Sequence, residues 1–169
     1  MSSTVQNNAA LHPTVLECLQ KYGIEFRVLE CDPELADTAA FCSHYGFDPE
    51  QAANAIVVAG KSDPIKYACC MVLATTKLDV NKKVRHLLEV SRASFATAEQ
   101  TLDLTGMQIG GVTPFGLQSI PLFIDAAVMQ HPEVIAGGGN RSSKVLLNPE
   151  EFKKLPNVQI IEAMAIRRE

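Results

Sequence analysis

The residues best suited to chemistry lie in one short stretch, Gly110-Gly111-Val112-Thr113-Pro114. Adjacent glycines adopt backbone dihedrals that other residues avoid, and they let another molecule approach the main chain closely. The proline removes one N–H donor and stiffens the exit from the turn. Main-chain amides left open in such a turn can bind a carbonyl, phosphate or carboxylate, as they do in oxyanion holes. The same spacing is also typical of a tight connection between two strands, and that alternative stays open at this point.

No side chain stands out as a general base or a metal ligand. The four histidines occupy positions typical of structural histidines. They are His12, His44, His86 and His131. The five cysteines are odd in number and lack metal-ligand spacing, so we expect buried free thiols in a reducing compartment and no metal site. The run from Gly137 to Lys144 lacks the Gly-Lys-Ser/Thr sequence of a phosphate loop, which argues against a nucleoside triphosphate cofactor.

Length and composition favour one domain without a membrane anchor. A chain of 169 residues with 47% hydrophobic residues can bury a sizeable core. The first eight residues are polar and show no signal-peptide layout, and no apolar run approaches the ~18 residues of a membrane span. We therefore expect a soluble, cytoplasmic protein.

The charge balance limits the partners that the chain can have. A net charge of −4 argues against a protein that coats DNA or other nucleic acid non-specifically. A tRNA partner would need a local basic patch. Candidates for that patch are Lys77, Lys82, Lys83, Arg85 and Arg92, with Arg141 and Lys144 as further possibilities. A solvated helix face explains the first group equally well.

The elements that must position the glycine-rich stretch can be predicted from periodicity and capping signals. Apolar strands are expected at 55–59 and 67–74, joined as a hairpin and covered on both faces. Thr97 and Gln100 have the spacing of a capping box for a helix that ends at Gly106, directly before the stretch. Further helices are predicted at about 12–22, 38–45, 49–53, 80–89 and 149–155, and further strands at 24–28, 93–96, 121–125, 133–136, 144–147 and 158–161.

These elements define the fold class. Strands outnumber long helices and are often joined by loops of hairpin length, which favours an α+β fold with a mixed, mainly antiparallel sheet over a doubly wound one.

With these elements in order, the sequence resembles the YbaK/EbsC family, relatives of the editing domain of bacterial prolyl-tRNA synthetases. The matching segments keep the family order and include Tyr22-Gly23-Ile24, Asp32-Pro33, Ala55-Ile56-Val57-Val58, Leu78-Asp79 with Lys82-Lys83, Thr105-Gly106, the Gly110–Pro114 loop, Ile124-Asp125 and Gly137-Gly138-Gly139. The resemblance covers about residues 12–163, leaving 1–11 as an expected flexible arm and 164–169 as an expected tail. It implies a curved, partly barrel-like sheet surrounded by helices, and hydrolysis of the ester between a wrong amino acid and a tRNA.

The resemblance also implies roles for particular residues. In the loop Gly110, Gly111, Val112, Thr113 and Pro114, the amides of Gly111, Val112 and Thr113 would bind the ester carbonyl. Thr38 and Ala39 would line the amino-acid pocket, Asp125 matches a family aspartate for which a structural bond is the competing role, and Gly137, Gly138 and Gly139 would contact the tRNA end. Relatives recruit a ribose hydroxyl of the tRNA and a bound water rather than a side-chain base.

One position departs from the family pattern. Where characterised bacterial members carry a lysine, this chain has Asn54. An asparagine amide offers two donors and one acceptor but no charge. The resemblance predicts a free-standing deacylase that removes a small amino acid from mischarged tRNA, with an aminoacyl-tRNA synthetase as a further candidate partner. The lost lysine keeps open the alternative of a non-catalytic binder of tRNA ends or aminoacyl compounds.

Overall fold

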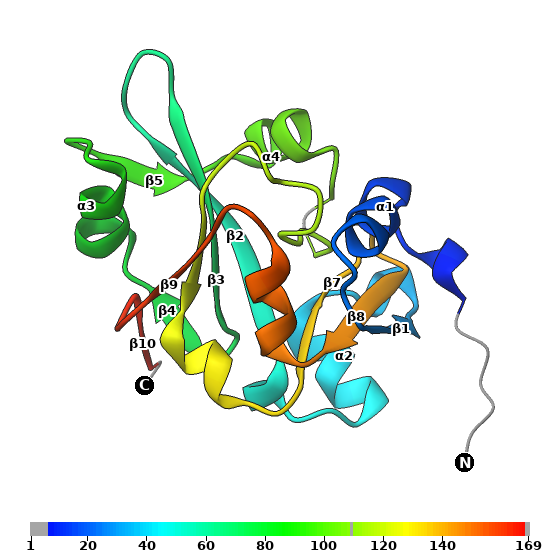
Figure 1. Cartoon of the computed structure of the whole chain (residues 1–169). Helices are drawn as coiled ribbons and strands as arrows, with labels where there is room; N and C mark the ends of the chain where they lie inside the picture. Colours follow the sequence, from blue (N-terminus) through cyan, green and yellow to red (C-terminus); the bar gives the residue numbers. More distant parts are fainter. Residues whose placement is uncertain (1–6, 109, 168–169) are drawn as a thin grey trace.

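A long antiparallel hairpin organises the computed structural model, which describes residues 7–108 and 110–167 (Figure 1). Its strands are β2 (Ala53–Gly60) and β3 (Lys66–Leu73). Side chains alternate along a strand, and those of Cys69, Met71 and Leu73 enter one core while Ala68, Cys70 and Val72 enter another. The predicted hairpin, covered on both faces, is therefore confirmed.

The hairpin lies inside a five-stranded sheet of mixed direction. The strand order is β5 (Ala93–Phe95), β2, β3, β6 (Leu122–Asp125) and β9 (Val158–Ile161). The β5–β2 and β2–β3 pairs are antiparallel, whereas β3–β6 and β6–β9 are parallel. The predicted α+β class with a mixed, mainly antiparallel sheet is confirmed.

A smaller antiparallel sheet contains β1 (Arg27–Glu30), β8 (Ser143–Leu147) and β7 (Val134–Gly137), in that order. A parallel bridge between Ala52 and Ile135 connects β7 to the start of β2. Within the described part of the chain the sheets do not close into a barrel. This bridge brings the β7 end of the small sheet against the base of the long hairpin, which creates the hollow described below.

Three α-helices begin and end at predicted signals. They are α1 (Pro13–Lys21), α2 (Thr38–Tyr45) and α4 (Ala98–Thr105). The capping box of α4 is present, because Thr97 Oγ1 accepts the N–H of Gln100 and the Gln100 side chain accepts the N–H of Thr97. Gly46 and Gly106 end α2 and α4 in the left-handed conformation, with φ of 77° and 71°.

Several other segments form single turns rather than the helices expected. The predicted helix 80–89 is a π-helical turn, η4 (Val80–Val84), followed by one α-turn, α3 (Arg85–Leu88). The last predicted helix is a 3₁₀ segment, η6 (Pro149–Lys154). Further 3₁₀ turns are η1 (Asn8–Ala10), η2 (Pro33–Leu35), η3 (Pro49–Gln51) and η5 (Ala126–Gln130).

Two short strands, one in the middle of the chain and one near its C-terminal end, were not predicted. β4 (Thr76–Leu78) pairs antiparallel with β10 (Ala165–Arg167), which lies in the segment expected to be a tail. Arg167 also forms an ion pair with Glu50, with Nη2 2.6 Å from Oε2. Of the expected flexible arm, residues 1–6 lie outside the described residues, and Leu11 is buried.

The buried side chains form three clusters, which we name after their helices. The α1 core includes Val15, Cys18 and Cys69, and the α3 core includes Cys70 and Leu88. The α2 core includes Cys31, Phe41, Cys42, Ile135 and Leu146. All five cysteines are buried and free, as predicted. Across the described residues, none of the helices combines the length and apolar composition that a membrane crossing requires.

Candidate functional site

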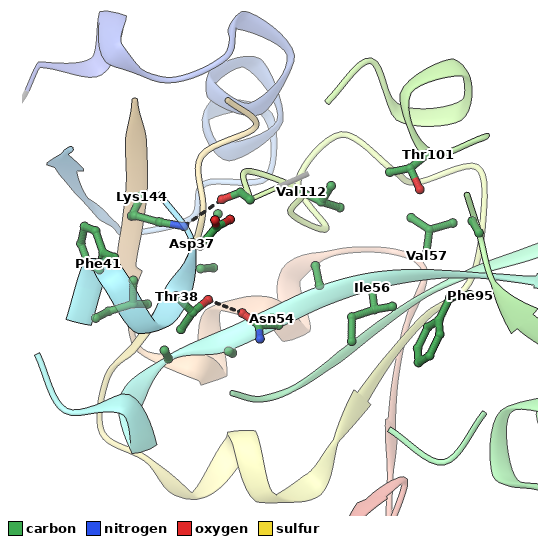
Figure 2. Close-up of a pocket in the computed structure, with 18 residues that line it drawn as sticks. Asp37, Thr38, Phe41, Asn54, Ile56, Val57, Phe95, Thr101, Val112 and Lys144 are labelled. Carbon is green, nitrogen blue, oxygen red and sulfur yellow. Dashed lines mark hydrogen bonds between the residues drawn. The ribbon is translucent and has the colours of Figure 1, made fainter. Parts of the chain in front are cut away.

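A cavity of about 500 Å³ opens between β2, α2, β7 and the glycine-rich loop (Figure 2). We call it the main cavity. Its lining comes from segments far apart in the chain: Asp37, Thr38 and Phe41, residues 52–57, Phe95, Ala96, Thr101, Gly110, Val112, residues 135–137 and Lys144. Five of these residues are alanines, namely Ala52, Ala53, Ala55, Ala96 and Ala136. The lining therefore combines short apolar side chains with a few polar groups, the composition expected of a small-ligand site.

Thr38 and Asn54 meet in this cavity. Thr38 lies in the first turn of α2 and Asn54 is the second residue of β2. The hydroxyl of Thr38 donates to Oδ1 of Asn54 at 2.7 Å (Figure 2). Because this bond uses the amide oxygen as the acceptor, the NH₂ group of Asn54 is the part that can donate to a ligand. The structure thus brings together two residues that the resemblance singled out for substrate binding.

Lys144 is a buried cation beside this pair. Its side chain enters from β8, is 6% exposed, and donates from Nζ to the carbonyl oxygens of Ala36 at 2.6 Å and Gly110 at 2.9 Å. The ammonium also lies 5.6 Å from the centre of the Phe41 ring. Burial lowers the pKa of Lys144, while the nearby Cys31 and Asp37 oppose that shift. The possibility that Lys144 belongs to a surface basic patch is therefore wrong.

Lys144 connects two walls of the cavity. Ala36 directly precedes the start of α2, and Gly110 opens the glycine-rich loop. One charged group therefore holds both segments at a fixed separation. The strand pattern gives a signal for the burial of Lys144, which shares a strand face with Leu146 in the α2 core, but none for its two bonded partners.

Asp37 and Arg141 form the rim near α2. Arg141 Nη1 lies 3.2 Å from Asp37 Oδ1, and Arg141 Nε donates to the carbonyl of Pro33 at 3.0 Å. Asp37 precedes α2 but its side chain does not cap the helix. This aspartate side chain is 70% exposed and lines the cavity. Among the described residues, the lining contains this one carboxylate and no histidine.

The glycine-rich loop presents only part of its main chain to the cavity. Gly110 and Val112 line it. The N–H of Gly111, which the resemblance assigned to the ester carbonyl, donates to the carbonyl of Gln108 at 2.9 Å within the turn. Thr113 is fully buried, and neither it nor Pro114 lines the cavity. Of the amides of Gly111, Val112 and Thr113, that of Val112 belongs to a residue facing the hollow.

The three glycines at the end of β7, Gly137, Gly138 and Gly139, have different neighbours. Gly137 lines the cavity, and a Cβ there would overlap the carbonyl oxygens of Gly111 and Val112. Gly138 accepts the N–H of His12 through its carbonyl at 3.0 Å. Gly139 donates to the carbonyl of Gly111 at 2.7 Å and has φ of 88°. The run therefore lets the loop, β7 and α1 approach closely, and only its first residue reaches the main cavity.

Other predicted site residues lie elsewhere. Ala39 is exposed and does not line the cavity. Asp125 is 3% exposed, and its Oδ1 accepts the N–H of Met164 at 3.0 Å, so it connects β6 to the segment before β10. Lys77 and Lys82 are exposed on β4 and η4, and Lys83 is half-buried. Arg85 lines a second cavity, which is considered below.

Neither metal chemistry nor a thiol nucleophile is indicated by the side chains. In the described ranges, no group of three or more histidine, cysteine, aspartate or glutamate residues is placed to hold a metal ion. Burial raises the pKa of the Cys69 thiol to about 12, which keeps it protonated. What the main cavity offers is a set of hydrogen-bond donors around a hollow of limited width.

Fold and site together define an α+β domain with a small-ligand cavity between a mixed sheet and a glycine-rich loop. The family model of the aminoacyl-tRNA editing domain matches residues 32–155, a span that contains every segment lining the cavity. The chain belongs to the aminoacyl-tRNA editing domain family. Membership supports a function in aminoacyl-tRNA editing, with aminoacyl-tRNA as the substrate class.

The chain is also similar to individual proteins. The uncharacterized protein YwhH of Bacillus subtilis (strain 168) is 27% identical over 128 residues, which are 75% of this chain and 79% of YwhH. Among solved structures, hypothetical protein APE2540 has a TM-score of 0.80 at 19% identity, covering 90% of this chain and 99% of its own. A "putative trans-editing enzyme for prolyl tRNA synthetase" has a TM-score of 0.78 at 23% identity, covering 98% and 100%. The two solved structures establish likeness of fold.

Proposed function

We propose that this protein is a trans-acting deacylase that hydrolyses the ester between a small amino acid and tRNA. The observation that carries the proposal is the main cavity itself, where Thr38, Asn54 and the Gly110 loop meet around about 500 Å³. That volume lies in the range of small-molecule sites, roughly 300–1,000 Å³. The short alanine side chains leave this volume open to the aminoacyl group, and the volume limits how large that group can be.

Three groups would bind the aminoacyl end. The NH₂ group of Asn54 and the main-chain N–H of Val112 would donate to the ester carbonyl and to the oxyanion that forms from it. The exposed carboxylate of Asp37 at the rim would accept from the α-ammonium group. Asn54 in place of the family lysine suits this arrangement, since an amide donates without repelling that ammonium.

In the reaction, a water oxygen attacks the ester carbonyl carbon and forms a tetrahedral intermediate. The bond between that carbon and the ribose oxygen then breaks, and the ribose oxygen leaves with a proton from the attacking water. Because no histidine lines the cavity among the described residues, the neighbouring ribose hydroxyl of the substrate would relay this proton. The protein contributes donors and position rather than a base.

A panel of tRNAs mischarged with amino acids of increasing size tests the proposal. We expect hydrolysis above the spontaneous rate for the small residues, falling as the side chain outgrows the cavity. Asn54→Ala should lower kcat by roughly 10²-fold, the lower end of what losing one oxyanion donor costs. The matched control is Gln159→Ala, which removes an exposed amide on β9. No acceleration on any member of the panel would overturn the proposal.

The second candidate function is a binder of tRNA ends without turnover. The observation that favours it is the Gly111 N–H, which is occupied by Gln108 and so removes one donor for an oxyanion. This candidate predicts saturable binding of mischarged tRNA and an unchanged rate of ester loss. Filter binding beside the deacylation assay separates the two functions.

A further inference from the structure

A second cavity of about 660 Å³ lies next to the main cavity. We call it the basic cavity because its lining includes Lys61, Arg85 and Arg92. The other lining residues include three serines, Ser62, Ser91 and Ser94. Within the described residues no carboxylate lines it. A hollow with three cations and no anion is unusual in a chain of net charge −4, and it favours an anionic ligand.

The two cavities follow one another along the same three elements. On β2, Val57 lines the main cavity and Ala59 and Gly60 line the basic cavity. On β5, Phe95 lines the main cavity and Ala93 and Ser94 the basic one. On α4, Thr101 belongs to the main cavity and Gln100 to the basic cavity. An extended ligand can therefore occupy both by crossing the β2–β5 pair.

Phe95 lies where the main cavity meets the basic cavity. It pairs with Val58 in the sheet and is 55% exposed, although it is a large apolar residue. Figure 2 shows its ring near Ile56. The two preceding residues on β5, Ala93 and Ser94, line the basic cavity, whereas Phe95 lines the main cavity. Phe95 therefore lies at the boundary between the two cavities. An exposed aromatic ring beside a basic groove is the arrangement by which proteins stack single-stranded bases.

The cations of the basic cavity are positioned by the main chain. Arg85 donates from Nε to the carbonyl of Asn81 at 2.9 Å and from Nη1 to that of Val90 at 3.5 Å. The N–H of Lys61 donates to the carbonyl of Arg92 at 2.8 Å, which places these two residues side by side. The Lys61 and Arg92 side chains are exposed, so both can reach a ligand.

We propose that the basic cavity binds the phosphodiester backbone of a single-stranded RNA end whose 3′ terminus occupies the main cavity, with a base stacked on Phe95. This inference rests on the proposed function, which puts an ester-bearing ribose in the main cavity. A free mononucleotide would use the cations but would not need an aromatic ring at the boundary. A duplex would not let a base reach that ring.

Binding of a short uncharged RNA that ends in CCA-3′ provides the first test, by fluorescence anisotropy over a range of salt concentrations. Lys61→Ala and Arg92→Ala should each weaken binding and reduce the slope of log affinity against log salt by about 0.7, the value for one phosphate contact on a single strand. Phe95→Ala should weaken binding at least about fivefold with little change in slope. Lys153→Ala is the matched control, because Lys153 is an exposed lysine paired with Glu150 on η6, and it should change neither quantity.

Comparison of two esters separates this inference from the proposed function. The wild-type protein should prefer mischarged tRNA over the same amino acid esterified to adenosine, which carries no phosphate. In Lys61→Ala and Arg92→Ala that preference should fall by the factor by which RNA affinity falls. If both variants keep the full preference and the full RNA affinity, the inference is overturned while the deacylase stands.

The opposite outcome, in which the deacylase fails and the RNA site stands, can also be recognised. If neither ester is hydrolysed but RNA affinity still depends on Lys61, Arg92 and Phe95, the deacylase fails and the RNA site stands. Equal affinity for adenosine monophosphate and for the RNA would overturn the inference, since it would show a mononucleotide site. Thermal unfolding of each variant checks that these exposed substitutions leave the fold intact.

Discussion

At the scale of single residues, one ammonium group fixes the shape of the main cavity. Lys144 connects the carbonyls of Ala36 and Gly110, and little of its side chain reaches solvent. A lysine carries several kcal/mol of desolvation cost when it is buried, so its hydrogen bonds must offset that cost. Replacement of Lys144 should consequently change both the stability and the function of the protein.

We expect Lys144→Met to lower both the free energy of unfolding and the rate of deacylation. Methionine approximates the length of lysine but donates no hydrogen bond, so two buried carbonyls lose their partner at about 1–3 kcal/mol each. Urea denaturation should show this loss in the free energy of unfolding, and kcat for mischarged tRNA should fall as the loop shifts. Lys153→Met serves as the control, since the Lys153 side chain is 54% exposed. A Lys144→Met protein as stable and active as the wild type would contradict the positioning role.

Asp125 gives the fold a pH dependence. Burial raises the pKa of Asp125, although the N–H groups of Met164, Ala165 and Ala126 oppose the shift. The folded state therefore holds a proton in a pH window where the unfolded chain has lost it. The contribution of Asp125 to stability is present below the unfolded pKa and is lost as pH rises through the folded pKa.

Asp125→Asn should remove this dependence. The free energy of unfolding of the wild type should decline from acidic towards neutral pH relative to that of the variant, because asparagine does not titrate. Urea titrations of both proteins at several pH values measure the difference. A constant difference between the two proteins across that range would show that Asp125 does not titrate as described.

At the scale of elements, sequence patterns predicted what depends on local chemistry. The capping box at Thr97 and the apolar run of β3 are local signals, and both elements formed as expected. The segment 80–89 has the apolar spacing of a helix, but Glu89 adopts φ of 56° and ends the helix after one α-turn. β4 and β10 are three residues long and exist through pairing across about ninety positions, which no local pattern contains.

The candidate site shows the same difference between features with a signal in the sequence and features that depend on long-range contacts. The resemblance pointed to Thr38, Asn54 and the glycine-rich loop. The basic cavity and the place of Phe95 arise from pairing between β2 and β5, and the bonds of Lys144 arise from three separate segments. Contacts of this kind are set by the register of distant strands, which a single sequence does not reveal.

The contact between β7 and the glycine-rich loop can be tested with one methyl group. Gly137→Ala would place a Cβ against the main-chain carbonyls of Gly111 and Val112, which have little room to move. We expect a loss of about 1–3 kcal/mol in the free energy of unfolding. The initial rate of deacylation should fall by a larger fraction than the free energy of unfolding does. Denaturation and initial rates on one mischarged tRNA measure both.

Ala163→Gly is a useful control for that experiment. Ala163 has φ of 54°, a conformation that glycine adopts without strain, and it lies in the turn before β10. Its replacement should leave deacylation unchanged. If Gly137→Ala retains wild-type activity and stability, the loop is not held against β7 as described.

At the scale of the whole molecule, the central hairpin belongs to all three cores. Ala52, directly before β2, belongs to the α2 core, Ala53, the first residue of β2, belongs to the α1 core, and Val58 packs in the α3 core. No core can open without disturbing the same two strands. This arrangement predicts one cooperative unfolding transition.

The five cysteines can report on that cooperativity, because they are distributed over the three cores. Burial raises the pKa of each thiol, so a thiol reagent should label the native protein slowly even at mildly alkaline pH. With rising urea, all five should become reactive together at the midpoint of unfolding. Mass spectrometry of labelled peptides follows each one, and early labelling of Cys31 and Cys42 alone would reveal a separate α2 core.

The alanines that line the main cavity also bear on how its selectivity can change over generations. Alanine and valine codons differ by one nucleotide, and a valine at such a position would narrow the hollow while the surrounding backbone stayed in place. Isolated point mutations at these positions can thus change which group the cavity accommodates without altering the other lining residues. Homologues that share this scaffold are accordingly expected to diverge first in the size of the group that fits the cavity.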